Sequence, residues 1–247
     1  MNSIFFRRNH VRKQVLVLFF ISIIMTACSS PSAPKAEPAL PIIPTNTDVP
    51  APTIAPTPTP DLLIFKDDFN GAIGPGWTVQ NINKKTSLTN NPGWLELIAR
   101  SPLGSKNYFL RPIPEGDFEL ETKMIFEPVA NFQIAGLMIS YSTTNYVLFG
   151  RASVMGSDGF YMDLMKSGKL TGDNFATSAP GTDTVYLRLR RVGNTYTSYY
   201  SEDGSHWTQV GVHTSEMKPK NVGLAAGQST SGLQPAQFDY FVINKIY

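Results

Sequence analysis

Three carboxylates, Asp117, Glu119 and Glu121, stand at alternate positions in the segment DFELETK and have the chemistry of a hydrolytic site. Side chains two residues apart in a strand project from the same face, so all three would point to one side. Cleavage of a glycosidic bond uses two carboxyl groups about 5–5.5 Å apart for retention or about 6.5–9.5 Å apart for inversion. The same alternation arises on any solvated strand face opposite an apolar one, which Phe118 and Leu120 would form. The segment therefore admits both a hydrolytic site and an ordinary solvated face.

The stretch SEDGSHW, which begins at Ser201, is dense in reactive side chains and yet predicts a turn. Ser201 and Asp203 can accept hydrogen bonds from nearby backbone N–H groups, and Gly204 readily adopts a positive φ. We expect Trp207 to fold back onto the core and its neighbour His206 to point outward. The pattern resembles a shortened Asp-box, which is a structural turn in carbohydrate-active β proteins.

The composition argues against several other chemistries. The chain has one cysteine, Cys28, and three histidines, and both Cys28 and His10 precede the domain. The two histidines that the domain keeps, His206 and His213, are too few for a Cys/His zinc site, and a disulfide framework is excluded. It contains no G-x-S-x-G nucleophile elbow, phosphate-binding loop or dinucleotide fingerprint. From residue 61 onward 16 Lys and Arg residues face 17 Asp and Glu residues, so nothing indicates nucleic-acid binding.

The elements that would position these residues are short strands. Runs rich in β-branched and aromatic residues recur after residue 61, broken by Gly, Asn, Asp and Pro, whereas a helical period is almost absent. The pattern predicts an all-β domain, an antiparallel sandwich or jelly roll. The expected strands lie within residues 62–69, 94–100, 107–111, 117–127, 132–142, 145–151, 159–166, 184–192, 195–201, 206–212, 221–227 and 236–244.

Alternation within these runs divides their residues between an inner and an outer face. The inward residues expected in the core are Phe118, Leu120, Phe160, Met162, Leu164, Val185, Leu187, Leu189, Tyr196, Ser198 and Tyr200. Aromatic, arginine and aspartate side chains on the opposite side would suit a sugar, which presents both C–H faces for stacking and hydroxyls for hydrogen bonding. The predicted carbohydrate-binding residues are Tyr161, Asp163, Tyr186, Arg188, Arg190 and Tyr199. Tyrosine and arginine are also common outward residues of strands that bind nothing.

The N-terminal quarter of the chain predicts export and anchoring. A basic start is followed by the apolar run VLVLFFISIIMTA, which is shorter than the roughly 20 residues that span a bilayer. The tetrapeptide MTAC resembles a bacterial lipobox, so residues 1–27 are read as a lipoprotein signal peptide and Cys28 as the lipidated residue; an uncleaved signal anchor is the alternative. Residues 28–60, with ten prolines between residues 29 and 60, predict an extended linker without packed structure.

Several segments together resemble the bacterial concanavalin A-like domains of unknown function, which are related to the C-terminal domain of some β-xylosidases. They are DDFNG (67–71), GDFELETKM (116–124), AGLMISYSTTNYV (135–147), LRLRRVGNTYTSYYSEDGSHWTQVG (187–211) and FDYFVI (238–243). The resemblance covers nearly all of the domain at 61–247. It implies a two-sheet antiparallel jelly-roll sandwich in which the first and last strands are neighbours.

The resemblance also bears on metal binding and catalysis. It implies that Asp67 and Asp68 approach Asp239, and carboxylate oxygens in such a group would suit a structural Ca²⁺ ion. The alternative is that these aspartates only end or edge their strands. Catalytic relatives in the superfamily carry E-x-D-x-x-E, and the D-x-E-x-E of this chain departs from that pattern in order and spacing.

The sequence thus predicts a lipoprotein at the bacterial cell surface, anchored in the membrane through Cys28, whose extracytoplasmic domain binds a polysaccharide or another glycan without cleaving it. Two alternatives remain. One is a glycoside hydrolase that uses Asp117, Glu119 and Glu121. The other is a structural or adhesion module with a protein partner, because fold-level resemblance cannot select among these functions.

Overall fold

The computed structural model describes residues 62–81, 86–100, 106–176 and 180–247, all of which belong to the expected β domain. The signal peptide predicted at 1–27, the lipidation site at Cys28 and the linker at 28–60 lie outside the described residues. Within the described ranges no helix is long and apolar enough to cross a membrane.

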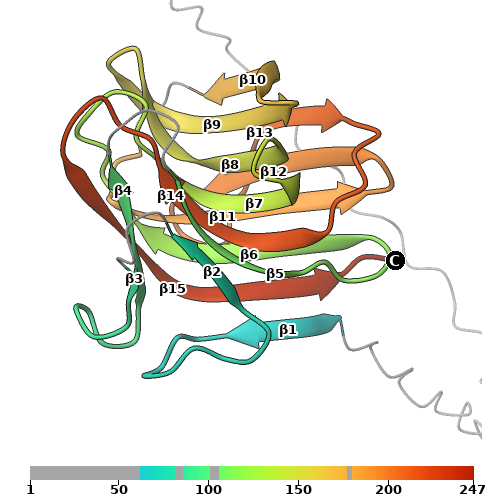
Figure 1. Ribbon diagram of the computed structural model, residues 1–247, viewed down its shortest axis with the longest axis horizontal. Coiled ribbons are helices and arrows are strands. Elements are labelled where there is room, and N and C mark those ends of the chain that lie inside the picture. The colour runs from blue at the N-terminus through green and yellow to red at the C-terminus, as the bar shows by residue number, and fades with distance from the viewer. Residues whose placement is uncertain (1–61, 82–85, 101–105, 177–179) are drawn as a thin grey trace, which may run out of the picture. The chain divides into compact units, whose positions relative to one another are not determined.

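The strands form two antiparallel sheets packed face to face as a sandwich (Figure 1). In the eight-stranded sheet, β6 occupies a central position between β11 and β15, so its outward side chains meet those of both neighbours. The strands of this sheet, in spatial order, are β13 (Thr208–Thr214), β12 (Thr195–Ser201), β11 (Thr184–Val192), β6 (Phe118–Ile125), β15 (Leu233–Lys245), β4 (Leu95–Arg100) and β3 (Thr86–Ser87), with β1 (Leu63–Asp67) paired to β15.

The seven-stranded sheet is built around the consecutive hairpins of β7, β8 and β9. The spatial order of its strands is β10 (Lys169–Ala176), β9 (Ser157–Lys166), β8 (Asn145–Val154), β7 (Ile134–Ser142), β14 (Asn221–Gly227), β5 (Lys106–Pro112) and β2 (Thr78–Asn81). All described pairings in both sheets are antiparallel. The predicted all-β jelly-roll sandwich is confirmed, and so is the predicted proximity of the first and last strands, because β1 pairs with β15.

Each of the twelve predicted runs contains a strand, and β2, β3 and β10 were not predicted. β2 and β3 are only four and two residues long, which leaves too little alternation to detect. β10 pairs only with β9 at one edge of its sheet, and its sequence includes Gly172, Asp173 and Asn174. These residue types are depleted in strands, so local propensity opposes the pairing that β9 provides.

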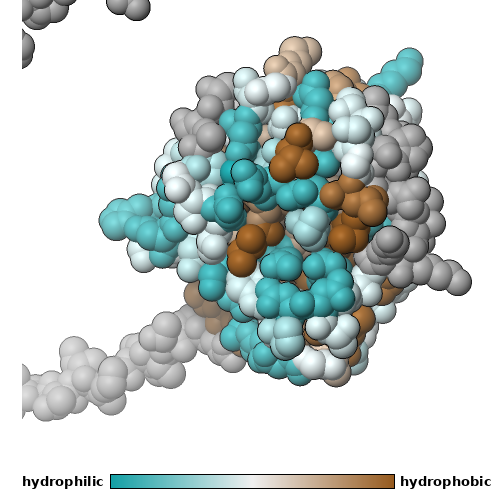
Figure 2. Space-filling view, turned by 90° about the vertical axis from the view of Figure 1, so that its left-hand side faces the viewer, coloured by the Kyte–Doolittle hydropathy of each residue, from teal (hydrophilic) through white to brown (hydrophobic). Residues whose placement is uncertain are grey.

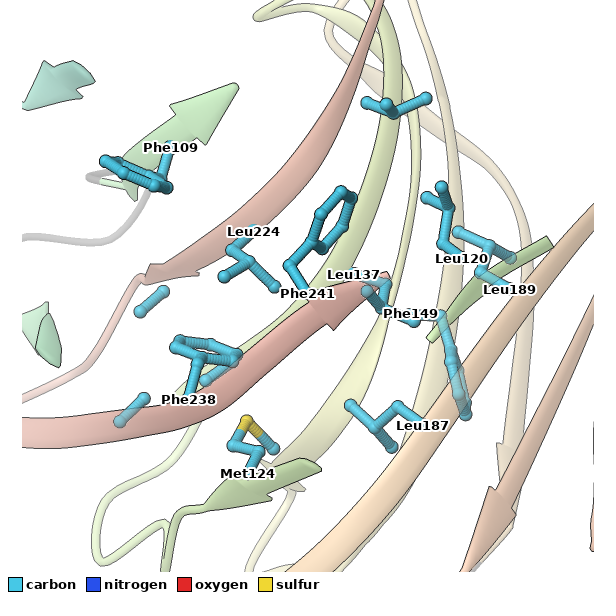
Figure 3. Close-up of a cluster of buried hydrophobic side chains, with 14 of the residues drawn as sticks. Phe109, Leu120, Met124, Leu137, Phe149, Leu187, Leu189, Leu224, Phe238 and Phe241 are labelled. Carbon is cyan, nitrogen blue, oxygen red and sulfur yellow. The ribbon is translucent and has the colours of Figure 1, made fainter. Parts of the chain in front are cut away.

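The core lies between the two sheets and is filled by their inward residues (Figure 3). Leu187 and Phe241 from the eight-stranded sheet meet Phe109 and Leu137 from the seven-stranded sheet in one buried cluster. The predicted inward residues Phe118, Leu120, Phe160, Met162, Val185, Leu187, Leu189, Tyr196 and Ser198 are buried, and Leu164 and Tyr200 pack against the cluster. The alternation therefore assigned both faces of these strands correctly.

Candidate functional site

The six predicted carbohydrate-binding residues do not form one surface. Tyr161 and Asp163 lie on β9 of the seven-stranded sheet, whereas Tyr186, Arg188 and Arg190 lie on β11 and Tyr199 on β12 of the eight-stranded sheet. All six point away from the core, but the outer faces of the two sheets are on opposite sides of the sandwich. The six residues therefore cannot share one binding face, because alternation reports the inner and outer sides of a strand and not the sheet to which that strand belongs. Sugar binding by any of them stays a prediction.

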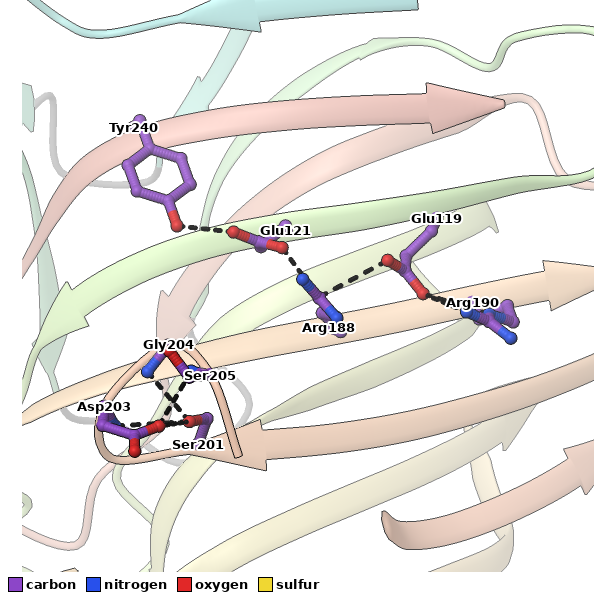
Figure 4. Close-up of polar contacts among 9 residues, drawn as sticks. All are labelled: Glu119, Glu121, Arg188, Arg190, Ser201, Asp203, Gly204, Ser205 and Tyr240. Atoms are coloured by element: carbon purple, nitrogen blue, oxygen red, sulfur yellow. Dashed lines mark hydrogen bonds and ion pairs between the residues drawn. The ribbon is translucent and has the colours of Figure 1, made fainter. Parts of the chain in front are cut away.

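On the eight-stranded sheet two glutamates of β6 face two arginines of β11 and form what we call the ion-pair ladder: Glu119, Glu121, Arg188 and Arg190 (Figure 4). Arg190 donates from Nε and Nη2 to Glu119 Oε2 at 3.0 and 2.8 Å. Arg188 Nε donates to Glu121 Oε2 at 2.7 Å and lies 3.4 Å from Glu119 Oε1. The hydroxyl of Tyr240 donates to Glu121 Oε1 at 2.6 Å. The ladder satisfies its own charges across the strands.

The ladder places the sequence's candidate catalytic residues in structural roles. Glu119 and Glu121 are held by arginines, and Asp117 accepts a hydrogen bond from the backbone N–H of Gly193 at 2.8 Å. A glycosidase needs one carboxyl group that protonates the leaving oxygen and a second that faces the sugar. The geometry of these three residues supports cross-strand pairing and offers no support for hydrolysis.

The turn after β12 has the predicted architecture (Figure 4). Ser201 Oγ accepts hydrogen bonds from the N–H groups of Asp203 and Gly204, and Asp203 Oδ1 accepts from those of Ser205 and His206. Gly204 has φ +77°, and a Cβ at this position would lie 3.1 Å from the ring of Tyr186. The turn therefore requires glycine for both conformation and space.

One side chain of the turn, that of Trp207, departs from expectation. Trp207 does not fold onto the core: the guanidinium of Arg188 stacks 3.7 Å from its ring centroid on the outer face. His206 is exposed as predicted, and the structure also gives it an acid partner, with Nδ1 2.6 Å from Asp203 Oδ2. Hydrogen bonds from the backbone and ring of His206 hold the pKa of Asp203 well below its usual range, and Asp203 raises the pKa of His206. This pair closes the turn.

The three aspartates of the predicted calcium site already have other partners. Asp67 accepts hydrogen bonds from the backbone N–H of Phe69 and Gly74 and from Trp77 Nε1, at 2.8 to 3.0 Å. Asp68 pairs with Lys66 at 2.8 Å, and Asp239 pairs with Lys123 at 2.9 Å. The described part of the chain has no group of three or more His, Cys, Asp or Glu side chains placed to hold a metal ion. The aspartates as arranged do not fit a shared Ca²⁺ ion, and calcium binding stays an untested prediction.

The outer face of the seven-stranded sheet carries a second buried cluster, separate from the core. Its side chains alternate with the inward ones along β5, β7, β8 and β14, so they belong to the side of the sheet away from the core. The cluster consists of Tyr108, Leu110, Ile134, Met138, Tyr146, Leu148, Ala152 and Ala225, with Val154, Tyr161 and Met165 packed against it. Buried apolar residues on the outer face distinguish this sheet from one whose outward residues are polar and solvated.

Asp163 lies among these residues and is only 3% exposed. Its Oδ1 atom is buried and has no hydrogen-bond partner among the described residues. Burial raises the pKa of the Asp163 carboxyl to about 7, while the nearby Lys106 lowers it and Asp173 raises it further. A buried acceptor without a partner costs free energy, so its presence calls for a ligand or another functional reason.

Lys106, from β5, lies on the same face and is 6% exposed. Its Nζ donates hydrogen bonds to the hydroxyl of Tyr146 at 3.0 Å and to Gln228 Oε1 at 3.2 Å. Burial lowers the pKa of Lys106, and the Coulombic attraction of Asp163 opposes that change. These hydrogen bonds join Lys106 of β5 to Tyr146 of β8 and to Gln228, which directly follows β14, and Asp163 of β9 influences Lys106 through its charge.

Two cavities open on this face. The first, which we call the Asp163 pocket, has a volume of about 150 Å³ and is lined by Phe132, Ile134, Ala152, Val154, Tyr161, Asp163, Met165, Leu170 and Gln228. The second, of about 280 Å³, includes Gln80, Tyr108, Met138, Tyr141 and Asn221. The Asp163 pocket has mostly apolar walls with a few polar groups, a combination typical of sites for small organic ligands.

Sequence reasoning found two residues of the Asp163 pocket, Tyr161 and Asp163, and missed Gln228 in its lining. It also missed Lys106 and Tyr146, which are hydrogen-bonded to each other, with Lys106 also bonded to Gln228. The run NYFLR was predicted as a strand, but Lys106 precedes it, and Gln228 directly follows the last residue of β14. The available signal was the alternation of Tyr146 with Val147 and Phe149. It marks an outward tyrosine and does not indicate which strands lie beside it.

Comparison with known proteins gives a consistent relationship. The model of the family described as "Beta xylosidase C-terminal Concanavalin A-like domain" matches residues 66–244. Among curated proteins, a xylan 1,3-beta-xylosidase from Vibrio sp is 28% identical over 180 residues, which cover 64% of this chain and 33% of that enzyme.

Solved structures share the fold. The GH43 protein BlXynB from Bacillus licheniformis has a TM-score of 0.63 at 24% identity and covers 73% of this chain and 39% of its own. GH43B of Bacteroides ovatus has a TM-score of 0.65 at 19% identity and covers 79% of this chain and 42% of its own. A xylan beta-1,4-xylosidase from Bacillus halodurans C-125 has a TM-score of 0.63 at 24% identity over 79% and 41% of the two chains. This chain thus spans less than half the length of these relatives.

Proposed function

The chain belongs to the family of β-xylosidase C-terminal concanavalin A-like domains, and from that premise we propose that it is a non-catalytic glycan-binding module held at the bacterial cell surface. Its relatives combine this domain with further sequence, since the chain covers only 33% of the curated xylosidase and 39–42% of the similar solved chains named above. What those enzymes catalyse is therefore a property of longer proteins.

One observation carries the proposal: the buried, unpartnered Oδ1 of Asp163 lines a cavity with mostly apolar walls. A sugar ring has C–H groups that pack on such walls and donor groups that reach a carboxylate. Tyr161 stands beside Asp163 in the lining and supplies an aromatic ring together with a hydroxyl that donates to Asp173 Oδ2 at 3.1 Å. The aromatic ring of Tyr161 and the carboxylate of Asp163, both on the outer face of the seven-stranded sheet, support sugar binding there.

The opposite face gives the contrast that favours binding over hydrolysis. Glu119 and Glu121 are engaged by Arg188, Arg190 and Tyr240, so the carboxylates of the predicted hydrolytic site are occupied. Xylo-oligosaccharides are the first ligands to test, because the named relatives include xylosidases acting on β-1,3 and β-1,4 linkages.

The test is calorimetric titration of the full chain, purified in detergent, with the glycans that a glycan array identifies. Tyr161→Ala should weaken binding about 5–150-fold, as expected for the loss of about 1–3 kcal/mol of interaction free energy. Tyr199→Ala is the matched control, because Tyr199 is a half-buried outward tyrosine of the other sheet, and it should leave the affinity unchanged. Failure of the chain to bind any glycan on the array would overturn the proposal, as would equal affinities of the wild type and Tyr161→Ala.

The same titration is run with and without EDTA, because calcium binding by Asp67, Asp68 and Asp239 is untested.

The lipid anchor has its own test. Cys28→Ser should prevent incorporation of a radiolabelled fatty acid and leave an unprocessed precursor. Normal labelling of that variant would show that Cys28 is not the acylated residue.

A further inference from the structure

The Asp163 pocket presents an acceptor, a donor and an apolar wall close together, and this combination limits the ligand. We infer that the pocket binds the acetamido group of an N-acetylated sugar, an inference that rests on the glycan-binding function proposed above. The acetamido group offers an N–H, a carbonyl oxygen and a methyl group, and the pocket has a counterpart for each.

The acceptor is Asp163 Oδ1. The side chain is 97% buried, and this oxygen has no partner within the described part of the chain. A ligand that fills the pocket must therefore bring a donor, or the carboxylate oxygen stays unsatisfied in a dry site. An N–H group meets that requirement. An ester carbonyl or a carboxylate of the ligand does not, because neither has a hydrogen to donate.

The donor is the amide nitrogen of Gln228. Lys106 Nζ lies 3.2 Å from Gln228 Oε1, and a lysine ammonium can only donate, so the oxygen of the amide faces Lys106. The Nε2 group is thereby directed away from Lys106 and remains available to the pocket that Gln228 lines. Lys106 thus fixes Gln228 as a donor, which suits the carbonyl oxygen of an acetamido group.

The apolar wall consists of six side chains: Phe132, Ile134, Ala152, Val154, Met165 and Leu170. A ring bearing only hydroxyls would leave polar groups against this wall, whereas a methyl group is stabilised by the contact. A volume of about 150 Å³ corresponds to about five water molecules, which is the space of a small substituent or one ring. The pocket therefore selects a substituent and is too small for a length of polymer.

The backbone around the pocket is held in an unfavourable conformation. Phe132 and Gln228, both in its lining, have φ of +66° and +27°, and only five described residues other than glycine have positive φ. Such conformations cost about 1–3 kcal/mol each and persist where the surroundings enforce them, commonly at binding sites. Phe132 N–H donates to Ser153 O of β8 at 2.7 Å. Gln133 Nε2 donates to Ser229 Oγ, so the residues that follow Phe132 and Gln228 in sequence are bonded to each other.

The pocket lies toward the end of the sandwich that includes the turns after β8 and β14. Figure 2 shows that this end carries hydrophobic residues in separate groups among hydrophilic ones. Val129, Met155 and Leu233 are exposed in or beside the loops of this end, with Met155 85% exposed. Among the described residues visible in Figure 2, no continuous apolar patch covers this end, which favours a small polar–apolar ligand over a broad protein partner.

The experiment compares trisaccharides that differ at the substituent: N-acetylglucosamine trimer, its de-N-acetylated glucosamine counterpart, cellotriose and xylotriose. Titration at pH 8 keeps the Asp163 carboxyl ionised, because its pKa is about 7. The full chain in detergent should bind the acetylated trimer at least about tenfold more tightly than the other three.

Two variants test the pocket itself. Gln228→Ala removes the donor and should weaken binding of the acetylated trimer about fivefold or more. Ala152→Leu fills the cavity and should abolish that binding. Gln209→Ala is the matched control, because Gln209 is an exposed glutamine of β13 in the other sheet, and it should have no effect. Melting temperatures of all variants verify folding, and Gln228→Ala keeps the test valid if Ala152→Leu is unfolded.

The outcomes separate the two proposals. Preference for the acetylated trimer that is lost in Gln228→Ala supports both. Equal binding of xylotriose or cellotriose, unchanged in Gln228→Ala, sustains a glycan-binding function and overturns the acetamido inference. Binding of none of the trimers, together with no glycan bound on the array, overturns both.

Discussion

On the outer face of the eight-stranded sheet every carboxylate of the ion-pair ladder meets a guanidinium, whereas on the outer face of the seven-stranded sheet Asp163 keeps a buried oxygen without a partner. Both faces arise from the same alternation of inward and outward residues. One is satisfied within the fold, and the other holds an unmet hydrogen-bonding requirement together with a cavity. An unmet requirement that the fold sustains is the stronger indication of a ligand.

The contrast also shows why charged residues alone are poor predictors of a site. Arg188 and Arg190 look well suited to sugar hydroxyls in the sequence, but the neighbouring strand β6 supplies Glu119 and Glu121 at their registers. Asp163 has a lysine nearby, yet that lysine directs its Nζ to Tyr146 and Gln228. Asp163 Oδ1 therefore stays available to a ligand, because Lys106 forms its hydrogen bonds with Tyr146 and Gln228 instead.

The largest expected effect concerns Asp163. Its pKa is about 7 in the folded chain and 3.8 in the unfolded reference, so the folded state binds the proton more tightly. Stability is then greatest below about pH 4 and falls by up to about 4 kcal/mol as pH rises through 7. Asp163→Asn does not titrate, so the stability of this variant relative to wild type should increase across that window.

Urea unfolding of both proteins between pH 4 and 8.5 measures this difference. The groups facing Asp163 are Lys106 on β5, Tyr146 on β8, Tyr161 on β9 and Asp173 on β10. Burial raises the pKa of both tyrosines further above 10, so they do not titrate in the window. A pH-independent difference between wild type and Asp163→Asn would contradict the assignment.

The second effect concerns the backbone of the seven-stranded sheet, where β7 and β8 pair. Gly136 on β7 faces Gly150 on β8, and a Cβ at Gly150 would lie 1.9 Å from the carbonyl oxygen of Ala135. That atom belongs to the backbone and cannot rotate away, so Gly150→Ala should destabilise the domain by about 3 kcal/mol. Thermal unfolding provides the measurement, with Ser157→Ala as an exposed control on β9. A variant as stable as wild type would show that the two strands can separate at little cost.

A smaller effect is expected in the ion-pair ladder. Glu119→Gln keeps the shape of the side chain and removes the charge that meets Arg188 and Arg190, and should cost about 2 kcal/mol. The loss should shrink in 1 M NaCl, because salt screens partly exposed pairs. Chemical unfolding at low and high salt measures the loss of stability in Glu119→Gln. The control is Glu127→Gln, which changes an exposed carboxylate. Weaker glycan binding by Glu119→Gln at unchanged stability would instead assign ligand binding to this face.

The smallest effects belong to the turn after β12. Gly204→Val should destabilise by about 1–3 kcal/mol, because φ is +77° and the Cβ would approach the ring of Tyr186. His206→Ala should be nearly neutral, since that ring is exposed. Differential scanning calorimetry compares the two variants, and a large loss in His206→Ala would show that its pairing with Asp203 holds more than the turn.

The sequence by itself determined the features that depend on neighbours along the chain. The alternation of Val185, Leu187 and Leu189 places them in the core whatever strand lies beside them, because successive side chains of any strand point to opposite faces. The turn at Ser201 and Asp203 was equally predictable, since its hydrogen bonds join atoms no more than three residues apart. Twelve strands and an all-β sandwich or jelly roll followed from such local patterns, and the family resemblance implied the two-sheet jelly roll.

Only the tertiary structure decided which strands share a sheet. The charge of Lys106 acts on Asp163 because β5 and β9 belong to one sheet, although the residues are far apart in sequence. Tyr161 is separated from Tyr199 because β12 belongs to the other sheet. Pairing order is set by long-range packing of the whole core, and local alternation is the same for every order. The fold class was therefore legible in the sequence, whereas the pocket became visible only when the strands were assembled.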